Sequence, residues 1–293
     1  QLADRVAQNW TGVRGDAGGV TVFGLQAGVN IFQQEVGNDR LVLNAGGGDD
    51  RIDATSLEAD GIQLTMNGGL GNDVFLGSEG DDLIFGGDGN DVALMGAGDD
   101  TFVWNPGDDN DTLEGQAGFD TMLFNGANVG ETINIAANGG RAVFTRDVAN
   151  VVMDLNDTES IDFNALGGAD IITVNDLTGT DVTEINLNLA AAGGAGDGQI
   201  DTVVLQGTQG DDVVQVVGDG KGISIFGLGA VVHIAGFEAG VDRLVINGLD
   251  GDDVIEASGL SITGLTADGG SGNDVLIGGD DDDVLLGGFG DDV

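Results

Sequence analysis

Apolar residues along this chain of 293 residues alternate with polar ones in short runs, and glycine, asparagine or aspartate separates one run from the next. Examples are INIA at 133–136, AVFT at 142–145 and VVHIA at 231–235. Alternation over four to eight residues is typical of half-buried β-strands. Only 2–10 and 189–192 have a composition that could form a helical turn or two. The pattern predicts an all-β fold built from many short strands.

Nine-residue repeats give these strands a period. The chain reads GGLGNDVFL, GSEGDDLIF, GGDGNDVAL and MGAGDDTFV over 68–103, then GGSGNDVLI, GGDDDDVLL and GGFGDDV over 269–293. In each unit six residues predict a turn, in which glycine permits backbone angles closed to other residues. The last three predict a strand whose middle residue points inward. These inward residues are Phe75, Ile84, Ala93, Phe102, Leu276 and Leu285.

Two such units form one coil, so the turns alternate between two edges of a flattened parallel roll. Asp73 is then expected to stack over Asp91, and Asp82 over Asp100. Degenerate copies of the motif, each with an aspartate before a short apolar run, extend the pattern beyond the clean repeats. Their aspartates are Asp39, Asp50, Asp111, Asp120, Asp170, Asp201, Asp212, Asp242 and Asp253.

A longer period covers most of the chain. Residues 23–57 match 226–260 at a constant offset of 203, and the match resumes at Gly68 and Gly269 with an offset of 201. We therefore divide the chain into a first copy (1–123), central coils (124–222) and the start of a second copy (223–293). We expect the central stretch to continue as parallel coils rather than form a separate β-sandwich. About one and a half copies indicate a piece of a longer tandem array.

Charge narrows the possible partners. The chain has 51 acidic and 8 basic residues, for a formal net charge of −43. Such a chain is repelled by nucleic acid and by anionic membrane surfaces. It has no cysteine and one histidine, which excludes thiolate and multi-histidine metal sites. No apolar run is long enough to cross a bilayer, so neither nucleic-acid binding nor membrane insertion is expected.

The repeated carboxylates point to a hard cation instead. Aspartates stacked at the spacing of a coil repel one another, and a divalent cation between them reverses that effect. Six or more oxygen ligands at about 2.3–2.6 Å suit Ca²⁺, whereas Mg²⁺ demands tighter octahedral geometry. Because no such site exists in an unfolded chain, binding and folding would be one equilibrium.

The nonapeptide resembles the calcium-binding repeat of the RTX, or haemolysin-type, family. The resemblance implies a right-handed parallel β-roll or β-helix solenoid that forms on binding several Ca²⁺ ions. It also implies type I secretion and an extracellular or cell-surface location. Met95, Ser78 and Asp281 depart from the motif at glycine positions.

The resemblance also implies a set of calcium ligands. The stronger side-chain candidates are Asp73, Asp82, Asp91, Asp100, Asp274, Asp283 and Asp292, with the aspartates of the degenerate copies as weaker ones. Backbone carbonyl ligands are expected at Gly68, Leu70, Gly86, Asp88, Gly77, Glu79, Gly269, Ser271 and Gly287.

Three classes of function compete. The long internal duplication favours an extracellular structural protein: a calcium-stiffened rod, filament or adhesin stalk that could associate end to end through strand edges. The alternative is the non-catalytic RTX portion of a secreted polysaccharide-acting enzyme or hydrolase. We expect no enzyme within the chain, because it lacks tyrosine and His233 aligns with Asn30 of the first copy. An ice-binding surface is disfavoured, because no rank of threonine accompanies Asn72, Asn90 and Asn273.

Overall fold

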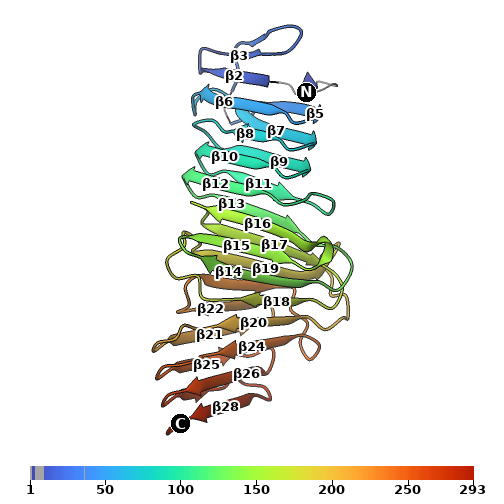
Figure 1. Cartoon of the computed structure of the whole chain (residues 1–293). Helices are drawn as coiled ribbons and strands as arrows, with labels where there is room; N and C mark the ends of the chain where they lie inside the picture. The colour runs from blue at the N-terminus through green and yellow to red at the C-terminus, as the bar shows by residue number, and fades with distance from the viewer. Residues whose placement is uncertain (1, 4–9, 36) are drawn as a thin grey trace. The chain divides into compact units, whose positions relative to one another are not determined.

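A computed structural model describes residues 2–3, 10–35 and 37–293, and nearly all of its regular structure is β-strand (Figure 1). The described part contains a single helical turn, a 3-10 turn at Val148–Asn150. No helix in the described residues is long and apolar enough to cross a membrane. The chain forms two compact units, Gln1–Phe124 with Val151–Ser160, and Asn125–Asn150 with Ile161–Val293. The three-part division by copies stays a prediction.

The first unit consists of strands from two sheets, and consecutive segments of the chain alternate between them. In hydrogen-bonding order, one sheet contains β1 (Leu2–Ala3), β5 (Arg40–Gly47), β7 (Gln63–Leu70), β9 (Asp82–Asp88), β11 (Thr101–Trp104) and β13 (Thr121–Asn125). The other contains β4 (Val29–Ile31), β3 (Gly19–Phe23), β2 (Trp10–Asp16), β6 (Arg51–Leu57), β8 (Val74–Leu76), β10 (Val92–Ala97), β12 (Thr112–Ala117) and β16 (Val151–Asn156).

The second unit repeats this arrangement. One sheet contains β17 (Ser160–Leu166), β19 (Glu184–Ala191), β23 (Val231–Ala235), β22 (Gly222–Phe226), β21 (Val213–Asp219), β25 (Val254–Leu260) and β27 (Val275–Ile277). The other contains β15 (Arg141–Arg146), β14 (Thr132–Asn138), β18 (Ile171–Val174), β20 (Thr202–Gln206), β24 (Arg243–Asn247), β26 (Leu265–Ser271) and β28 (Val284–Phe289). Both units therefore have the all-β, largely parallel architecture of a solenoid.

The strand register confirms that two nonapeptide units make one coil in the clean run. Val92 of β10 lies opposite Val74 of β8, and Thr101 of β11 lies opposite Leu83 of β9. The next coil is longer, because Val92 pairs with Thr112 on its other side. Equivalent positions of successive coils thus stack directly even where the coil length changes.

Antiparallel hairpins interrupt the expected all-parallel coils at β2–β3–β4, β14–β15 and β21–β22–β23. Their turns explain the difference. Asp16 Oδ1 accepts the Gly18 N–H at 2.7 Å, and Asp219 Oδ1 accepts the Lys221 N–H at 2.8 Å. Gly139 supplies a positive φ of 68° between β14 and β15. Asp, Asn and Gly in a short connection favour tight hairpins over crossovers.

The core lies between the two sheets of each unit. Phe75, Ile84, Ala93 and Phe102 are fully buried, as the inward ladder predicts. Leu285 lies opposite the buried Ala267 of β26, in register with the inward ladder, but it is 41% exposed because no described strand packs beyond β28. The helical turn suggested at 189–192 is also wrong, since β19 extends through Ala191. Most of the other suggested turn, at 2–10, lies outside the described residues.

Candidate metal centre

A ladder of aspartates runs along each edge of the coils in the first unit. On one edge, Asp50 N–H donates to Asp73 Oδ1 at 2.7 Å, Asp73 N–H to Asp91 Oδ1 at 2.6 Å, and Asp91 N–H to Asp111 Oδ1 at 2.8 Å. Each aspartate directly precedes a strand, so the register of the strands places its carboxylate beside the backbone of the preceding coil. One carboxylate oxygen of each of these acceptors is thereby satisfied.

The opposite edge carries a second ladder. Asp82 N–H donates to Asp100 Oδ1 at 2.7 Å and Asp100 N–H donates to Asp120 Oδ1 at 2.9 Å. The ladder continues to Glu159, whose Oε2 accepts the Asp120 N–H at 2.7 Å. Glu159 was missed by the sequence analysis, which considered only aspartate at these positions.

The second unit has the same two ladders, and most of their rungs come from degenerate motifs. Asp253, Asp274 and Asp292 accept in turn from the N–H of Asp212, Asp253 and Asp274. Asp170, Asp201 and Asp242 accept from the N–H of Glu131, Asp170 and Asp201. Asp283 Oδ1 accepts from the Leu265 N–H at 2.7 Å. The structure thus brings the weaker candidates into the same rows as the stronger ones, except Asp39, which is exposed.

The second carboxylate oxygen divides the turns into two kinds. We call a turn an open loop when this oxygen is buried and has no hydrogen-bond partner in the described part of the chain. Buried polar atoms are normally satisfied, so an orphaned carboxylate oxygen indicates a missing partner. The open loops end at Asp73, Asp91, Asp100, Asp111, Asp120, Asp170, Asp253 and Asp274.

Open loops share a backbone geometry. The second and fourth residues of the loop before Asp73, Gly69 and Gly71, have φ values of 111° and 115°. Leu249, the second residue of the loop before Asp253, has a φ of 83° although it is not glycine. Gln116 before Asp120 has a φ of 79°. Positive φ costs free energy for such residues, so the stacked coils impose the loop shape on an unfavourable sequence.

Glycine at the first position leaves a space beside the orphaned oxygen. A Cβ at Gly68 would lie 2.1 Å from Asp73 Oδ2 and 2.5 Å from the Gly86 carbonyl oxygen of the next coil. A Cβ at Gly248 would lie 2.2 Å from Asp253 Oδ2 and 2.6 Å from the Gly269 carbonyl oxygen. A carboxylate and a carbonyl therefore face a common space at equivalent loops of both units.

We call a turn a closed loop when a loop N–H donates to the second carboxylate oxygen. Ser78 N–H donates to Asp82 Oδ2 at 2.7 Å, and the Ser78 hydroxyl contacts Oδ1 of the same residue at 3.0 Å. The residue four before the aspartate acts similarly in the other closed loops, so these carboxylates are satisfied without a cation. The pairs are Glu35 with Asp39, Thr208 with Asp212, Glu238 with Asp242, and Gly279 with Asp283.

Burial makes the open-loop carboxylates hard to ionise. Loss of solvent, the largest cause, raises the pKa of Asp100 to about 9, and the charges of Asp82 and Asp120 add to this effect. The pKa of Asp111 is raised to about 8 and that of Asp73 to about 7, again chiefly by burial. The hydrogen bond from the preceding coil opposes the shift in each case. A bound cation would remove this penalty at neutral pH.

The donor atoms fit a hard cation such as Ca²⁺. They are carboxylate and carbonyl oxygens, which are the ligands that calcium prefers. The described residues contain no group of three or more His, Cys, Asp or Glu side chains able to hold a metal, so main-chain oxygens must complete any shell.

The expected carbonyl ligands fall into three groups. Gly86 and Gly269 direct carbonyls at the spaces beside Asp73 and Asp253. The carbonyls of Leu70, Asp88 and Ser271 accept an N–H from a neighbouring coil and keep a second lone pair. The remaining candidates form the third group. Gly68 is the first residue of an open loop, and Gly77 and Glu79 lie in the closed loop of Asp82. Gly287 is the first residue of the loop before the exposed Asp292.

Two other places were candidates for chemistry. Ser224 Oγ and His233 Nδ1 lie 2.9 Å apart, opposite each other on β22 and β23. The equivalent pair in the first copy, Thr21 and Asn30, forms the same cross-strand hydrogen bond at 2.9 Å. The same hydrogen bond therefore forms in both copies although both residues differ, so it is a structural feature of the hairpin.

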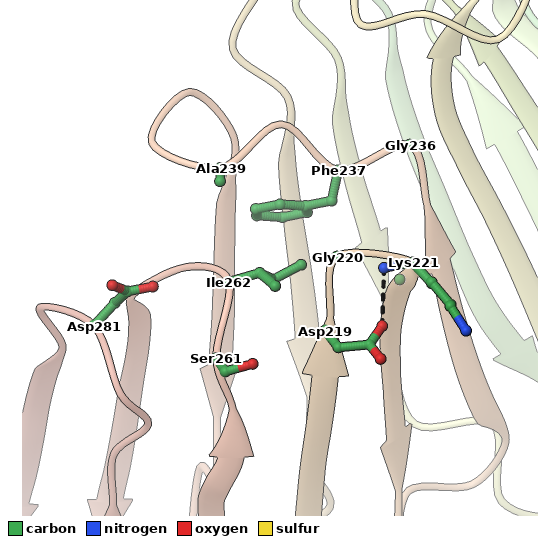
Figure 2. Close-up of a pocket in the computed structure, with 10 residues that line it drawn as sticks. Asp219, Gly220, Lys221, Gly236, Phe237, Ala239, Ser261, Ile262 and Asp281 are labelled. Atoms are coloured by element: carbon green, nitrogen blue, oxygen red, sulfur yellow. Dashed lines mark hydrogen bonds between the residues drawn. The ribbon is translucent and has the colours of Figure 1, made fainter.

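A pocket at the β21–β22 turn brings Phe237 and Ile262 together, while the Lys221 side chain extends away from them (Figure 2). Asp219 at this pocket accepts the Lys221 backbone N–H at 2.8 Å, so its carboxylate shapes the turn.

Calcium-free protein is expected to be most stable in acid. The raised pKa values mean that the folded chain holds protons that the unfolded chain, with aspartate pKa near 3.8, has released. The free energy of unfolding therefore falls as pH rises from about 4 to 9. Thermal unfolding of chelator-treated protein, followed by circular dichroism across this range, should show a falling midpoint. The Asp100→Asn variant should flatten the upper end, and a midpoint that rises between pH 5 and 8 would contradict the prediction.

Comparison with known proteins supports a calcium site. The model of the RTX calcium-binding nonapeptide repeat matches residues 67–102, 106–123 and 266–293, in four copies. No curated protein and no solved structure matches the chain. The matched segments contain the open loops of Asp73, Asp91, Asp100, Asp111, Asp120 and Asp274. With the parallel coils, the aspartate ladders and the oxygen-lined spaces, this match shows that the chain contains RTX calcium-binding nonapeptide repeats.

Proposed function

We propose that this chain is a segment of a secreted extracellular protein whose calcium ions hold a structural solenoid in its wound form. The ions bind at the open loops, with the ladder aspartates as side-chain ligands and carbonyls such as those of Gly86 and Gly269 completing the shell. The observation that carries this proposal is the row of buried carboxylate oxygens without partners. A chain with a net charge of −43 needs cations at these rows to bring its coils together.

A structural role is supported by the internal duplication. The β2–β6 and β21–β25 pairs are both parallel, and both carry a register shift after their third paired residue. A tandem array lengthens a molecule coil by coil, whereas a single active site gains nothing from a second copy of its scaffold further along the chain. We therefore favour a rod, filament or adhesin stalk over the calcium-binding portion of an enzyme.

End-to-end association of such segments is part of the proposal. β28 lies at the end of its sheet, and its Val284, Leu286 and Phe289 are 51%, 48% and 83% exposed. Unpaired strand edges with apolar side chains are templates for another strand. A further coil, from the same chain or from another copy, would cover them.

Removal of calcium should unfold much of the chain at neutral pH. Without a cation the open-loop carboxylates are buried charges that repel each other, so we expect the strand signal in far-UV circular dichroism to collapse in EGTA. Titration with Ca²⁺ should restore it cooperatively, whereas Mg²⁺ at the same concentration should not. A strand spectrum that is the same in chelator and in calcium would refute the calcium-dependent fold.

The two kinds of loop should differ in their need for calcium. Asp91→Asn in an open loop removes a charge that only a cation can balance, so it should lower the number of bound ions and weaken the remaining affinity about tenfold or more. Asp82→Asn in the neighbouring closed loop keeps the hydrogen bonds from Ser78 and to Asp100 and should leave the ion count unchanged. Isothermal titration calorimetry of both variants tests this difference. Equal losses of bound ions and of calcium affinity in the two variants would show that open and closed loops do not differ in calcium binding.

Electron microscopy of negatively stained protein tests the structural role. In Ca²⁺ we expect elongated particles that join into longer ones as concentration rises, because β28 offers an uncovered edge. The Leu286→Lys variant places a charge on that edge and should abolish joining while leaving single particles unchanged. Compact globular particles in calcium would argue against a rod.

A further inference from the structure

One strand edge is open in the first copy of the duplication and covered in the second. β2, β3 and β4 pair with one another in the same register as β21, β22 and β23, at a constant offset of 203. β23 also pairs in parallel with β19 on its other side. β4 is the last strand of its sheet in the described residues, so its other side has no strand partner among them. The two hairpins therefore differ in the neighbour of their last strand.

The side chains of β4 show what this neighbour would cover. Val232 and Ile234 of β23 are 0% and 1% exposed, whereas the equivalent Val29 and Ile31 of β4 are only half-buried. In β23 these two positions lie opposite buried aliphatic residues of β19. Burial of aliphatic surface is favourable, so the apolar side chains of β4 lack a stabilising contact that the second copy provides.

The backbone of β4 is open on the same side. Where β23 meets β19, the Val231 N–H donates to the Thr183 carbonyl oxygen at 2.9 Å. The residue equivalent to Val231 in the first copy is Gly28. Successive residues of a strand direct their N–H groups to alternate sides, so those of Gly28, Asn30 and Phe32 share this edge. Such an edge is a template for one more strand.

The other sheet of the first unit has the same gap. Leu2 of β1 lies opposite Leu43 of β5, as Leu205 of β20 lies opposite Ile246 of β24. β20 also pairs with β18, whereas β1 ends its sheet in the described residues. Both end strands of the first unit thus lack neighbours that their counterparts in the second unit possess.

We propose that the β4 edge is the junction between tandem copies, and that it binds a strand of the β19 type supplied by the preceding copy. This inference rests on the proposed structural array. The register of β19 on β23 would place Ile185 of the incoming strand opposite Val29, and Leu187 opposite Ile31. The β19 of this chain cannot serve, because β17 and β23 occupy both of its sides. β28 aligns with β9, whose next neighbour is β11, so the clean repeats are not the equivalent partner of β4.

An extended chain tests the junction. Residues 125–203 are added in front of Gln1, which the offset of 203 aligns with Val204. Hydrogen exchange is measured by mass spectrometry in excess Ca²⁺, with protein dilute enough that chains stay separate. In the original chain the amides of 28–32 should be at least about 10-fold less protected than those of 231–235, and in the extended chain the two should agree within about threefold. Equal protection in the original chain, or unprotected 28–32 in the extended chain, overturns the proposal.

Ile185→Asp/Leu187→Asp within the added segment alone is the matched control. It leaves the original β19 intact, so 231–235 should keep its protection. It places two charges where β4 offers apolar side chains, so the protection of 28–32 should be lost. Continued protection of 28–32 would mean that the added segment acts without a β19-type strand, which contradicts the proposal.

Introduced disulfides report the register independently, because the chain has no cysteine. Asn186 lies opposite His233, which aligns with Asn30. Asn30→Cys with Asn186→Cys in the added segment should therefore form a disulfide on mild oxidation, as His233→Cys with Asn186→Cys should in the original chain. Asn30→Cys with Asn188→Cys in the added segment should not, because its Cα atoms would be more than about 7 Å apart. If the His233 pair forms and the Asn30–Asn186 pair does not, the proposal fails.

Failure of the calcium function has its own signature in the same data. The amides of 74–104 should lose protection when EGTA replaces Ca²⁺, and a lack of response there refutes the calcium-dependent fold. The junction is judged separately, from the comparison of 28–32 with 231–235 in Ca²⁺ alone.

Discussion

The structure depends on one hydrogen bond repeated along each edge, in which a ladder aspartate accepts the backbone N–H of the equivalent residue one coil earlier. This bond ties the position of each carboxylate to the register of the parallel strands, as at Asp73 and Asp91. It also costs free energy, because it stacks carboxylates in buried rows where solvent cannot screen their charges. The loops differ in what satisfies the second oxygen of each carboxylate.

Two solutions occur in the same chain. A closed loop turns an N–H toward the oxygen, as Ser78 does for Asp82. Ala127 does the same for Glu131, with its N–H donating to Oε2 at 3.1 Å, while Arg146 contacts the other oxygen. An open loop leaves the oxygen without a hydrogen-bond partner in the described part of the chain, and we propose that a cation binds there. The kind of loop thus differs from coil to coil, although the backbone path is similar throughout.

Much of the fold and the rows of candidate ligands could be predicted from the sequence, because the nonapeptide combines turn glycines with strand alternation. The inward positions of Phe75 and Phe102 and the stacking of every second unit followed from that pattern. The distinction between Asp82 and Asp91 did not, because it depends on the backbone angles of the second and fourth loop residues, which are positive before Asp91 but not before Asp82. Glu131 with Arg146 was missed because the hairpin that joins them brings together residues from different motifs.

The hairpins leave the ladders undisturbed. Successive rungs are separated by 18 positions at Asp73 and Asp91, and by 41 at Asp212 and Asp253, where the second contour includes an antiparallel excursion. Both rungs have the same bond, at 2.6 and 2.8 Å. The scaffold thus tolerates insertions at points such as Gly139 and Gly220 without any change in the bond between rungs. New modules could be grafted there by evolution or by a designer, and the rows of carboxylates would keep their spacing whatever the length of the graft.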